Sequence, residues 1–145
     1  MDEYFASQIM SHDVLTVEQS TQIIEAAKKM NERNIGCIIV TERGNPVGIV
    51  TERDIVSLVA RNERPITTPV REIMSSPLVS VSPDATVWEL AEEMKLKKIH
   101  KMPIIDKNKL VGIVTTTDIT RLCSIGSDAE IRSVCQQILK RLNQP

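Results

Sequence analysis

The fold is decided by GIVTERDI at residues 48–55, which returns as GIVTTTDI at residues 112–119. The shift is 112 − 48 = 64 residues, and it holds without a gap over residues 9–55 against 73–119. Of these 47 aligned pairs 15 are identical, which identifies an internal repeat. Fixed-period similarity indicates one supersecondary unit used more than once. Two copies are too few for a solenoid, so we expect a pair that buries a shared core.

The composition of the 145 residues is that of a globular protein, with 41% hydrophobic and 26% charged residues. A net charge of −1 creates no field that would attract nucleic acid or an anionic membrane. Aromatic residues make up only 2%, which disfavours a site that stacks bases. No apolar run approaches the roughly 18 residues of a membrane span, and no signal peptide is recognisable. Three cysteines without a CxxC spacing predict neither a disulfide framework nor a zinc site, so we expect a cytoplasmic protein.

Each copy has the pattern of a β-α-β-β-α unit of a mixed α/β (α+β) fold. A brief strand is expected at 14–17 and at 78–81, and the next helix follows an N-cap at Ser20 or Asp84. Two β-branched runs with a turn between them predict a hairpin in each copy, with turns at 43–46 and 106–109. A closing helix then begins at Thr51 or Thr115.

The chain divides into four segments on this pattern. The first repeat covers 5–61, a linker 62–68, the second repeat 69–124, and a C-terminal amphipathic helix 127–142. The helix is predicted by a capping box at 127–130 followed by apolar residues with helical spacing. This helix either packs on its own domain or on a dimer mate, or it docks another protein.

The Thr-x-x-Asp at the start of each closing helix has two interpretations. Thr51 and Asp54, like Thr115 and Asp118, fit a capping box, in which the acid accepts from the cap N–H and contributes on the order of 1 kcal/mol. Alternatively the carboxylate accepts two hydrogen bonds from the diol of a ribose, as the acid of a dinucleotide-binding fold does. Free N–H groups and the dipole at the helix N-terminus favour an anion close by.

The sequence resembles a tandem pair of cystathionine-β-synthase (CBS) domains. The resemblance lies in the doubled β-α-β-β-α plan, in the paired Gly-Ile-Val-Thr-x-x-Asp motifs and in the run Ile99-His100-Lys101-Met102-Pro103-Ile104-Ile105. The resemblance covers roughly residues 5–123. It implies two repeats related by a pseudo-twofold axis, with two clefts between them that take adenosine-containing ligands such as AMP, ADP, ATP or S-adenosylmethionine. It also implies a homodimer.

The family's binding positions can be carried over to this chain. The resemblance implies one cleft made of Thr115, Thr117 and Asp118 with Asp13, Leu15, Ile35 and Gly36. The other cleft would use Thr51, Arg53 and Asp54 with Val79, Ile99 and His100. We favour the Asp118 cleft, because Arg53 replaces a hydroxyl in the other. His100 and Lys101 match positions that contact phosphates in nucleotide-sensing members, although Lys95–Lys101 also fits a solvated helix end.

These features predict a regulatory module and no enzyme. No catalytic triad order, metal-spaced cluster or Walker-type loop occurs in the sequence. No cofactor is expected beyond the adenosine effector, with Mg²⁺ only as a companion of ATP. The ligand would signal to a target protein whose identity the sequence does not reveal. Two alternatives stay open: a ligand-free interaction module that uses the C-terminal helix, and a nucleic-acid-binding regulator, which the charge disfavours.

Overall fold

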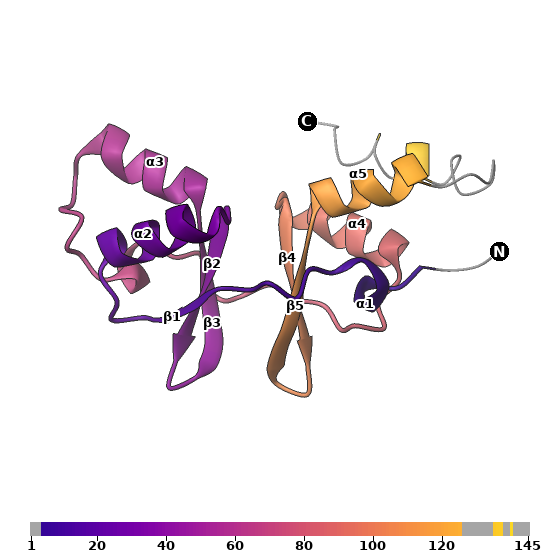
Figure 1. The fold of residues 1–145 in the computed structure, drawn as a ribbon, viewed down its shortest axis with the longest axis horizontal. Coiled ribbons are helices and arrows are strands. Elements are labelled where there is room, and N and C mark those ends of the chain that lie inside the picture. The colour runs from indigo at the N-terminus through magenta and orange to yellow at the C-terminus, as the bar shows by residue number, and fades with distance from the viewer. Residues whose placement is uncertain (1–3, 126–134, 138–139, 141–145) are drawn as a thin grey trace. The chain divides into compact units, whose positions relative to one another are not determined.

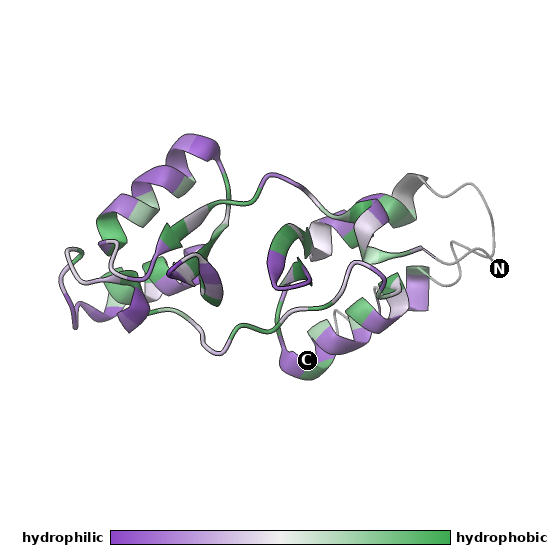
Figure 2. Ribbon diagram, turned by 90° about the horizontal axis from the view of Figure 1, so that it is seen from below, coloured by the Kyte–Doolittle hydropathy of each residue, from purple (hydrophilic) through white to green (hydrophobic). Residues whose placement is uncertain are grey.

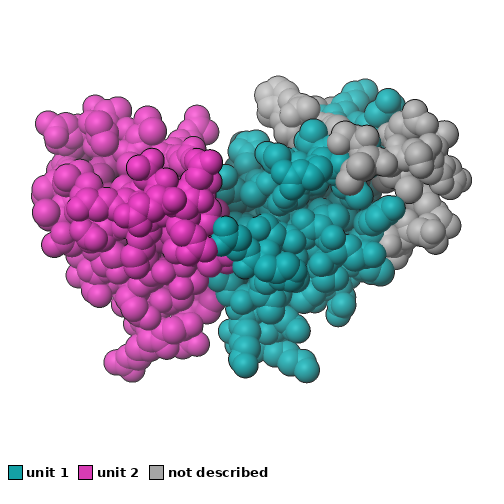
Figure 3. All heavy atoms as spheres, viewed as in Figure 1, with its two compact units in different colours: residues 1–13, 80–145 teal, residues 14–79 magenta. Residues whose placement is uncertain are grey.

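The computed structural model describes residues 4–125, 135–137 and 140, and it divides into two compact units (Figure 3). Unit 1 contains Met1–Asp13 and Ser80–Pro145, and unit 2 contains Val14–Val79. Each repeat opens with a short stretch, residues 5–13 in the first copy and 69–79 in the second, which we call its lead segment. The hairpin of each repeat therefore shares a unit with the lead segment of the other repeat. The repeats of the sequence and the units of the fold have different boundaries.

Unit 2 is built on a three-stranded sheet (Figure 1). Its strands, in the order β1-β2-β3, are β1 (Thr16–Glu18), β2 (Cys37–Glu42) and β3 (Asn45–Thr51). β1 is parallel to β2, and β2 is antiparallel to β3. The helices are α2 (Ile23–Arg33), α3 (Glu52–Arg61) and the short 3-10 helix η1 (Val70–Glu72). α2 packs against β2 and α3 against β3.

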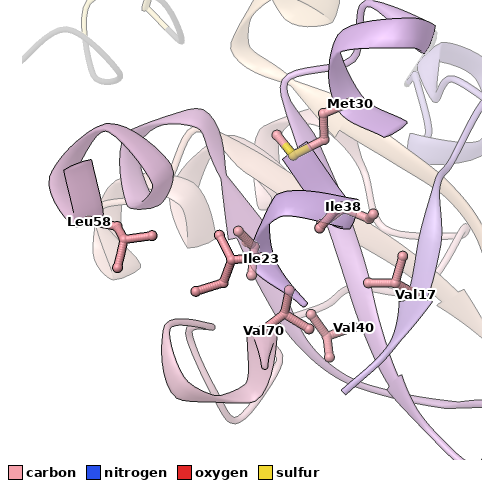
Figure 4. Packing of buried hydrophobic residues seen from close by; sticks show 9 residues of the cluster. Val17, Ile23, Met30, Ile38, Val40, Leu58 and Val70 are labelled. Atoms are coloured by element: carbon pink, nitrogen blue, oxygen red, sulfur yellow. The ribbon is translucent and has the colours of Figure 1, made fainter. Parts of the chain in front are cut away.

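The core of unit 2 follows from the helical spacing of apolar residues in α2. Ile23, Ala26 and Met30 are buried, whereas Glu25 and Lys28 are exposed, so one side of the helix is hydrophobic (Figure 2). The buried side meets the sheet and η1 (Figure 4), where the cluster consists of Val17, Ile23, Ala26, Met30, Ile38, Val40, Val50, Leu58 and Val70.

Unit 1 repeats this plan with a smaller sheet. Its elements are α1 (Ala6–Ile9), α4 (Val87–Lys97), β4 (Lys101–Asp106), β5 (Lys109–Thr115) and α5 (Thr116–Ile125). β4 and β5 are antiparallel, α4 packs on β4, and α1 contacts both β5 and α5. The mixed α/β fold and the two hairpins predicted from the sequence are thereby confirmed.

Glycine allows each lead segment to cross a strand closely. Ser11 and Ile113 exchange two backbone hydrogen bonds of 2.8 and 3.0 Å. At Gly112 a Cβ atom would lie 2.6 Å from Met10 Sδ and 2.9 Å from the Ser11 carbonyl oxygen. Ser75 and Ile49 are bonded in the same way, beside Gly48. Glycine is therefore required at the same place in both copies.

Both hairpins turn through two residues with positive φ, as type I′ turns require. The φ angles are 52° at Arg43 and 82° at Gly44, and 49° at Lys107 and 67° at Asn108. In unit 2 the Glu18 carboxylate accepts from the N–H groups of Arg43 at 3.1 Å and Gly44 at 3.0 Å. The bond from Gly44 is the largest cause that lowers the pKa of Glu18. The bonds from the Thr41 hydroxyl and from Arg43 N–H lower this pKa further.

The N-caps predicted at Ser20 and Asp84 are wrong. The helices start later, with Gln22 and Thr86 as N-caps. The reason is tertiary: the N–H of Ile23 donates to Thr68 O and that of Val87 to Tyr4 O, both at 2.8 Å. Distant carbonyl groups thus satisfy the first helical N–H groups.

The strand predicted at 78–81 is reduced to an isolated bridge between Val81 and Ile104. In unit 2 the N–H of Ile39 donates to Leu15 O at 2.8 Å and holds the corresponding segment on β2. The equivalent of Ile39 in the second copy is Pro103, which has no N–H to donate. One proline therefore shortens the sheet of unit 1.

The expectation that the cysteines form no disulfide is also wrong. Cys123 near the end of α5 is bonded to Cys135, with a Cα–Cα distance of 5.4 Å, while Cys37 is buried and is not part of a disulfide. Residues 135–137 and 140 are helical, and the remainder of the helix predicted at 127–142 lies outside the described residues. Within the described part of the chain, no helix has the length and apolar character that a membrane crossing requires.

Candidate functional site

The capping boxes predicted at the closing helices are present in both copies. The N–H of Thr51 donates to Asp54 Oδ2 at 2.8 Å, and the Thr51 hydroxyl donates to the same oxygen at 3.1 Å. Thr115 and Asp118 form the same pair of bonds at 2.8 and 3.2 Å. Each acid therefore stabilises the first turn of its helix, whatever else it does.

The cap uses only one oxygen of each carboxylate. Asp118 Oδ1 lies 3.8 Å from Arg121 Nη1, a loose ion pair because the Arg121 side chain is 70% exposed. Asp54 Oδ1 has no hydrogen-bond or ion-pair partner within the described residues. A carboxylate oxygen offers two lone pairs, so each Oδ1 can accept two hydroxyl groups without breaking the cap. Capping and binding of a diol are compatible in this geometry.

The start of each closing helix is tied to the segment that precedes its hairpin. The N–H of Thr116 donates to His100 O, and the N–H of Glu52 donates to Gly36 O, both at 3.1 Å. Lys101 pairs with Thr115 across the β4–β5 ladder. Unit 1 therefore brings the His100–Lys101 pair to the Thr115–Asp118 turn.

The predicted cleft residues are divided between the two units. Unit 1 contains Asp13, Ile99, His100, Lys101, Thr115, Thr117 and Asp118, and unit 2 contains Leu15, Ile35, Gly36, Thr51, Arg53, Asp54 and Val79. Asp13 and Val79 are the last residues before the chain passes from one unit to the other. Each predicted cleft combines residues of both units, whose relative positions are not determined, so both clefts stay predictions.

Each unit has a pocket beside its capping aspartate. In unit 2 the pocket has a volume of about 370 Å³ and is lined by Asp54, Ser57, Leu58, Arg61, Glu63, Arg64, Glu72 and Ile73. In unit 1 it has about 300 Å³ and is lined by Tyr4, Gln8, Ile9, Asp118, Arg121 and Leu122. The shift of 64 residues converts Asp54, Ser57, Leu58, Glu72 and Ile73 into Asp118, Arg121, Leu122, Gln8 and Ile9.

The pockets add residues that the sequence did not single out. The sequence pointed to the aspartates but not to Tyr4 or to the lead segments, which supply Ile9 in unit 1 and Ile73 in unit 2. The one sequence feature that could have indicated these residues is that isoleucine occupies the equivalent positions 9 and 73 in both repeats. The pocket of unit 2 is lined by more charged side chains, since it also contains Arg61, Glu63 and an Arg64–Glu72 ion pair of 2.8 Å.

The repeat, the two hairpins and the paired Thr-x-x-Asp turns agree with a comparison against known families. The model of the CBS domain matches the chain twice, over residues 6–61 and 70–125. The chain belongs to the CBS domain family.

This CBS pair has relatives in both archaea and bacteria. It is 40% identical to protein MK0525 of Methanopyrus kandleri over 118 residues, which is 79% of this chain and 60% of the relative. It is 39% identical to the CBS domain-containing protein YhcV of Bacillus subtilis over 110 residues, 76% of this chain and 79% of the relative. The match to MK0525 thus spans less than two thirds of that protein.

A solved structure shares the fold of this CBS pair over most of its length. The CBS domain pair of protein MJ0100, in complex with 5′-methylthioadenosine and S-adenosyl-L-methionine, superposes with a TM-score of 0.77. The two are 31% identical, and the match covers 85% of this chain and 98% of the other.

The two CBS repeats are unequal at their capping turns. The second repeat has a hydroxyl group at Thr117, one residue before its aspartate, where the first repeat has Arg53. Both side chains are exposed. The Thr115–Asp118 turn therefore carries two hydroxyl groups and a carboxylate, and the Thr51–Asp54 turn has a cation in place of one hydroxyl group.

Proposed function

We propose that this CBS pair is a regulatory module that binds an adenosine-containing ligand, with the Asp118 carboxylate accepting from the ribose diol. The observation that carries the proposal is that Asp118 caps α5 with Oδ2 alone, so that Oδ1, which lies in a loose 3.8 Å ion pair with the exposed Arg121, can accept from a ligand. The candidate ligands are AMP, ADP, ATP, S-adenosylmethionine and related compounds. Support for this class comes from the MJ0100 pair, which is in complex with 5′-methylthioadenosine and S-adenosyl-L-methionine.

The favoured site joins the Asp118 turn to residues of the other unit. Thr115 and Thr117 would hold the ligand beside Asp118, and Asp13, Leu15, Ile35 and Gly36 would enclose the adenine. The second cleft would use Thr51, Arg53 and Asp54 with Val79, Ile99 and His100. His100 and Lys101 would reach phosphate groups, because both stand next to the Thr115 turn.

A thermal-shift screen tests the ligand class. Protein freed of bound ligand by unfolding and refolding is heated with AMP, ADP, ATP, NAD, S-adenosylmethionine or methylthioadenosine. At a hundredfold excess over its Kd a ligand adds about 2.7 kcal/mol of stability, which raises Tm by on the order of 5–10 °C. Inosine, which has the ribose but not the 6-amino group, is the matched control. No shift with any adenosine compound would contradict the proposal.

The remaining parts of the proposal concern the assembly. The repeats 5–61 and 69–124 act together through the linker 62–68 in a cytoplasmic homodimer that catalyses no reaction. Mg²⁺ would enter only with ATP. The signal passes to a target protein as ligand binding shifts the population of module conformations. Light scattering on the purified chain measures the dimer, and a monomer at micromolar concentration would contradict it.

A ligand-free interaction module is the second candidate, because both Thr-x-x-Asp turns are satisfied as capping boxes. The exposed Val56 and Val59 on α3, 65% and 66% exposed, are available for contacts with another protein. The C-terminal helix would dock a partner in this case. The double variant Ile131→Asp with Ile138→Asp would then abolish partner binding, whereas the aspartate variants would leave it unchanged. Loss of partner binding in Asp118→Ala alone would favour the ligand-binding module.

A further inference from the structure

The two closing helices differ at one register position on their outer side. Position 59 on α3 is a valine that is 66% exposed. The equivalent position on α5 is Cys123, which is half-buried and bonded to Cys135. Cys135 belongs to a helical segment and is only 4% exposed. The disulfide therefore links the C-terminal segment to the second copy at Cys123, whereas the equivalent Val59 of the first copy is exposed.

We infer that Cys123 and Cys135 form a reversible thiol–disulfide site that couples the redox state of the surroundings to ligand binding at Asp118. The coupling part rests on the proposed function. The redox part rests on the cytoplasmic location of the proposed function, because disulfides of cytoplasmic proteins are transient or redox-sensing in most mesophiles.

The reaction is a two-step exchange with a dithiol reductant. A thiolate of the reductant attacks the sulfur of Cys123, the less buried of the two cysteines, and Cys135 leaves as a thiolate. The second thiolate of the reductant then attacks the mixed disulfide and releases Cys123. The protein gains two electrons and two protons as two thiols, and the reductant becomes its own disulfide. Oxidised glutathione reverses the exchange.

The bond is close to the candidate binding residues along α5. Cys123 follows Asp118 by five residues, about 7.5 Å along a helix. Arg121 and Leu122, the two residues before Cys123, line the unit 1 pocket together with Asp118 and with Ile9 of α1. A crosslink at Cys123 limits the movement of the part of α5 that carries these side chains. The oxidised form therefore presents a more ordered binding surface and binds the ligand more tightly.

Thiol counting tests the redox site without any ligand. After treatment with oxidised glutathione, iodoacetamide should label one of the three cysteines of the unfolded chain, namely Cys37. After treatment with dithiothreitol it should label all three. The oxidised form should melt on the order of 5–10 °C higher, because a closed loop of this length restricts the unfolded chain. Three labelled cysteines after oxidation would overturn the site.

Calorimetry tests the coupling with 5′-methylthioadenosine and AMP as probes. Oxidised protein should bind at least one of them about fivefold more tightly than reduced protein. The double variant Cys123→Ser with Cys135→Ser should lose this redox response, and Cys37→Ala should retain it. Affinities equal within twofold in the two redox states would overturn the coupling. If neither probe binds in either state, the proposed function fails, and the thiol count alone decides the redox site.

Discussion

The two closing helices, α3 and α5, show which parts of the repeat serve the fold and which were free to diverge. Both begin with the same Thr-x-x-Asp cap, with N–H to Oδ2 distances of 2.8 Å, and both follow a strand that needs a glycine. Their outer sides differ, since α3 exposes Val59 while α5 is bonded to the C-terminal segment through Cys123. Features that close the unit are shared, and features that face outward are specific to one copy.

The ends of the hairpins differ in the same way. In the first copy Glu18 binds the N–H groups of the Arg43–Gly44 turn. The equivalent residue in the second copy is Ser82, which accepts from Asp84 N instead. The turn geometry is retained in both copies. A type I′ turn therefore does not need a carboxylate, and Glu18 is an addition of one copy.

The largest expected effect separates the two aspartates. Asp118→Ala should raise the Kd for methylthioadenosine or AMP by about 100-fold, because two charge-assisted hydrogen bonds to the diol are lost. Asp54→Ala should change that Kd by less than about threefold. Both variants should lose about 1 kcal/mol of stability, since both acids cap a helix. Calorimetry and urea unfolding measure the two quantities, and a greater affinity loss in Asp54→Ala would reverse the comparison.

The glycine crossings should be equally sensitive in the two units. Gly48→Ala and Gly112→Ala should each cost about 1–3 kcal/mol, because the new Cβ would lie 2.9 Å from a backbone carbonyl oxygen that cannot move independently. Urea unfolding measures the loss. Gly44→Ala is the control for backbone strain alone, since its φ is 82° and no atom lies within 4 Å of the added Cβ. If Gly112→Ala left the free energy of unfolding unchanged, the backbone around Ser11 would have moved to make room for the new Cβ atom.

The N-caps of α2 and α4 provide a smaller contrast. Thr86 and Glu89 form a complete capping box with bonds of 3.1 and 3.2 Å, whereas Gln22 caps α2 without a side-chain bond. Thr86→Ala should therefore cost about 1 kcal/mol, and Gln22→Ala less than about 0.5 kcal/mol, by thermal unfolding. Gln22→Thr should raise stability, because Glu25 already occupies the position of Glu89. Equal losses in the two alanine variants would show that the box contributes nothing.

The smallest effect concerns pH. Since hydrogen bonds from Gly44, Thr41 and Arg43 lower the pKa of Glu18, its carboxylate stabilises the folded state at and above neutral pH. That contribution is lost as the pH falls below the usual range of a glutamate and through the lowered pKa. The protection factors for amide exchange, which are corrected for the intrinsic pH dependence of exchange, should fall on acidification more at Arg43 and Gly44 than at Lys107 and Asn108. Glu18→Gln should remove the difference, and identical acid responses of both turns would contradict this assignment.

The local elements were predictable because their determinants lie within a few residues of one another. The hairpins follow from turn residues at 43–46 and 106–109 between β-branched runs, and the caps follow from Thr-x-x-Asp. The N-caps of α2 and α4 were predicted two residues early, because carbonyl groups of Thr68 and Tyr4 satisfy the first N–H groups. For α2 no local pattern contains that information, whereas Thr86 and Glu89 form a local capping box that already marks the start of α4.

The sequence by itself determined the repeat, the hairpins, the capping turns and the CBS family, since each depends on spacing and on short-range hydrogen bonds. Only the tertiary structure decided which lead segment packs on which hairpin, and that Tyr4 and Ile9 line the Asp118 pocket. It also decided that Cys123 bonds to Cys135. These contacts join positions far apart in the chain, and their free energy depends on the packing of whole elements rather than on any local pattern.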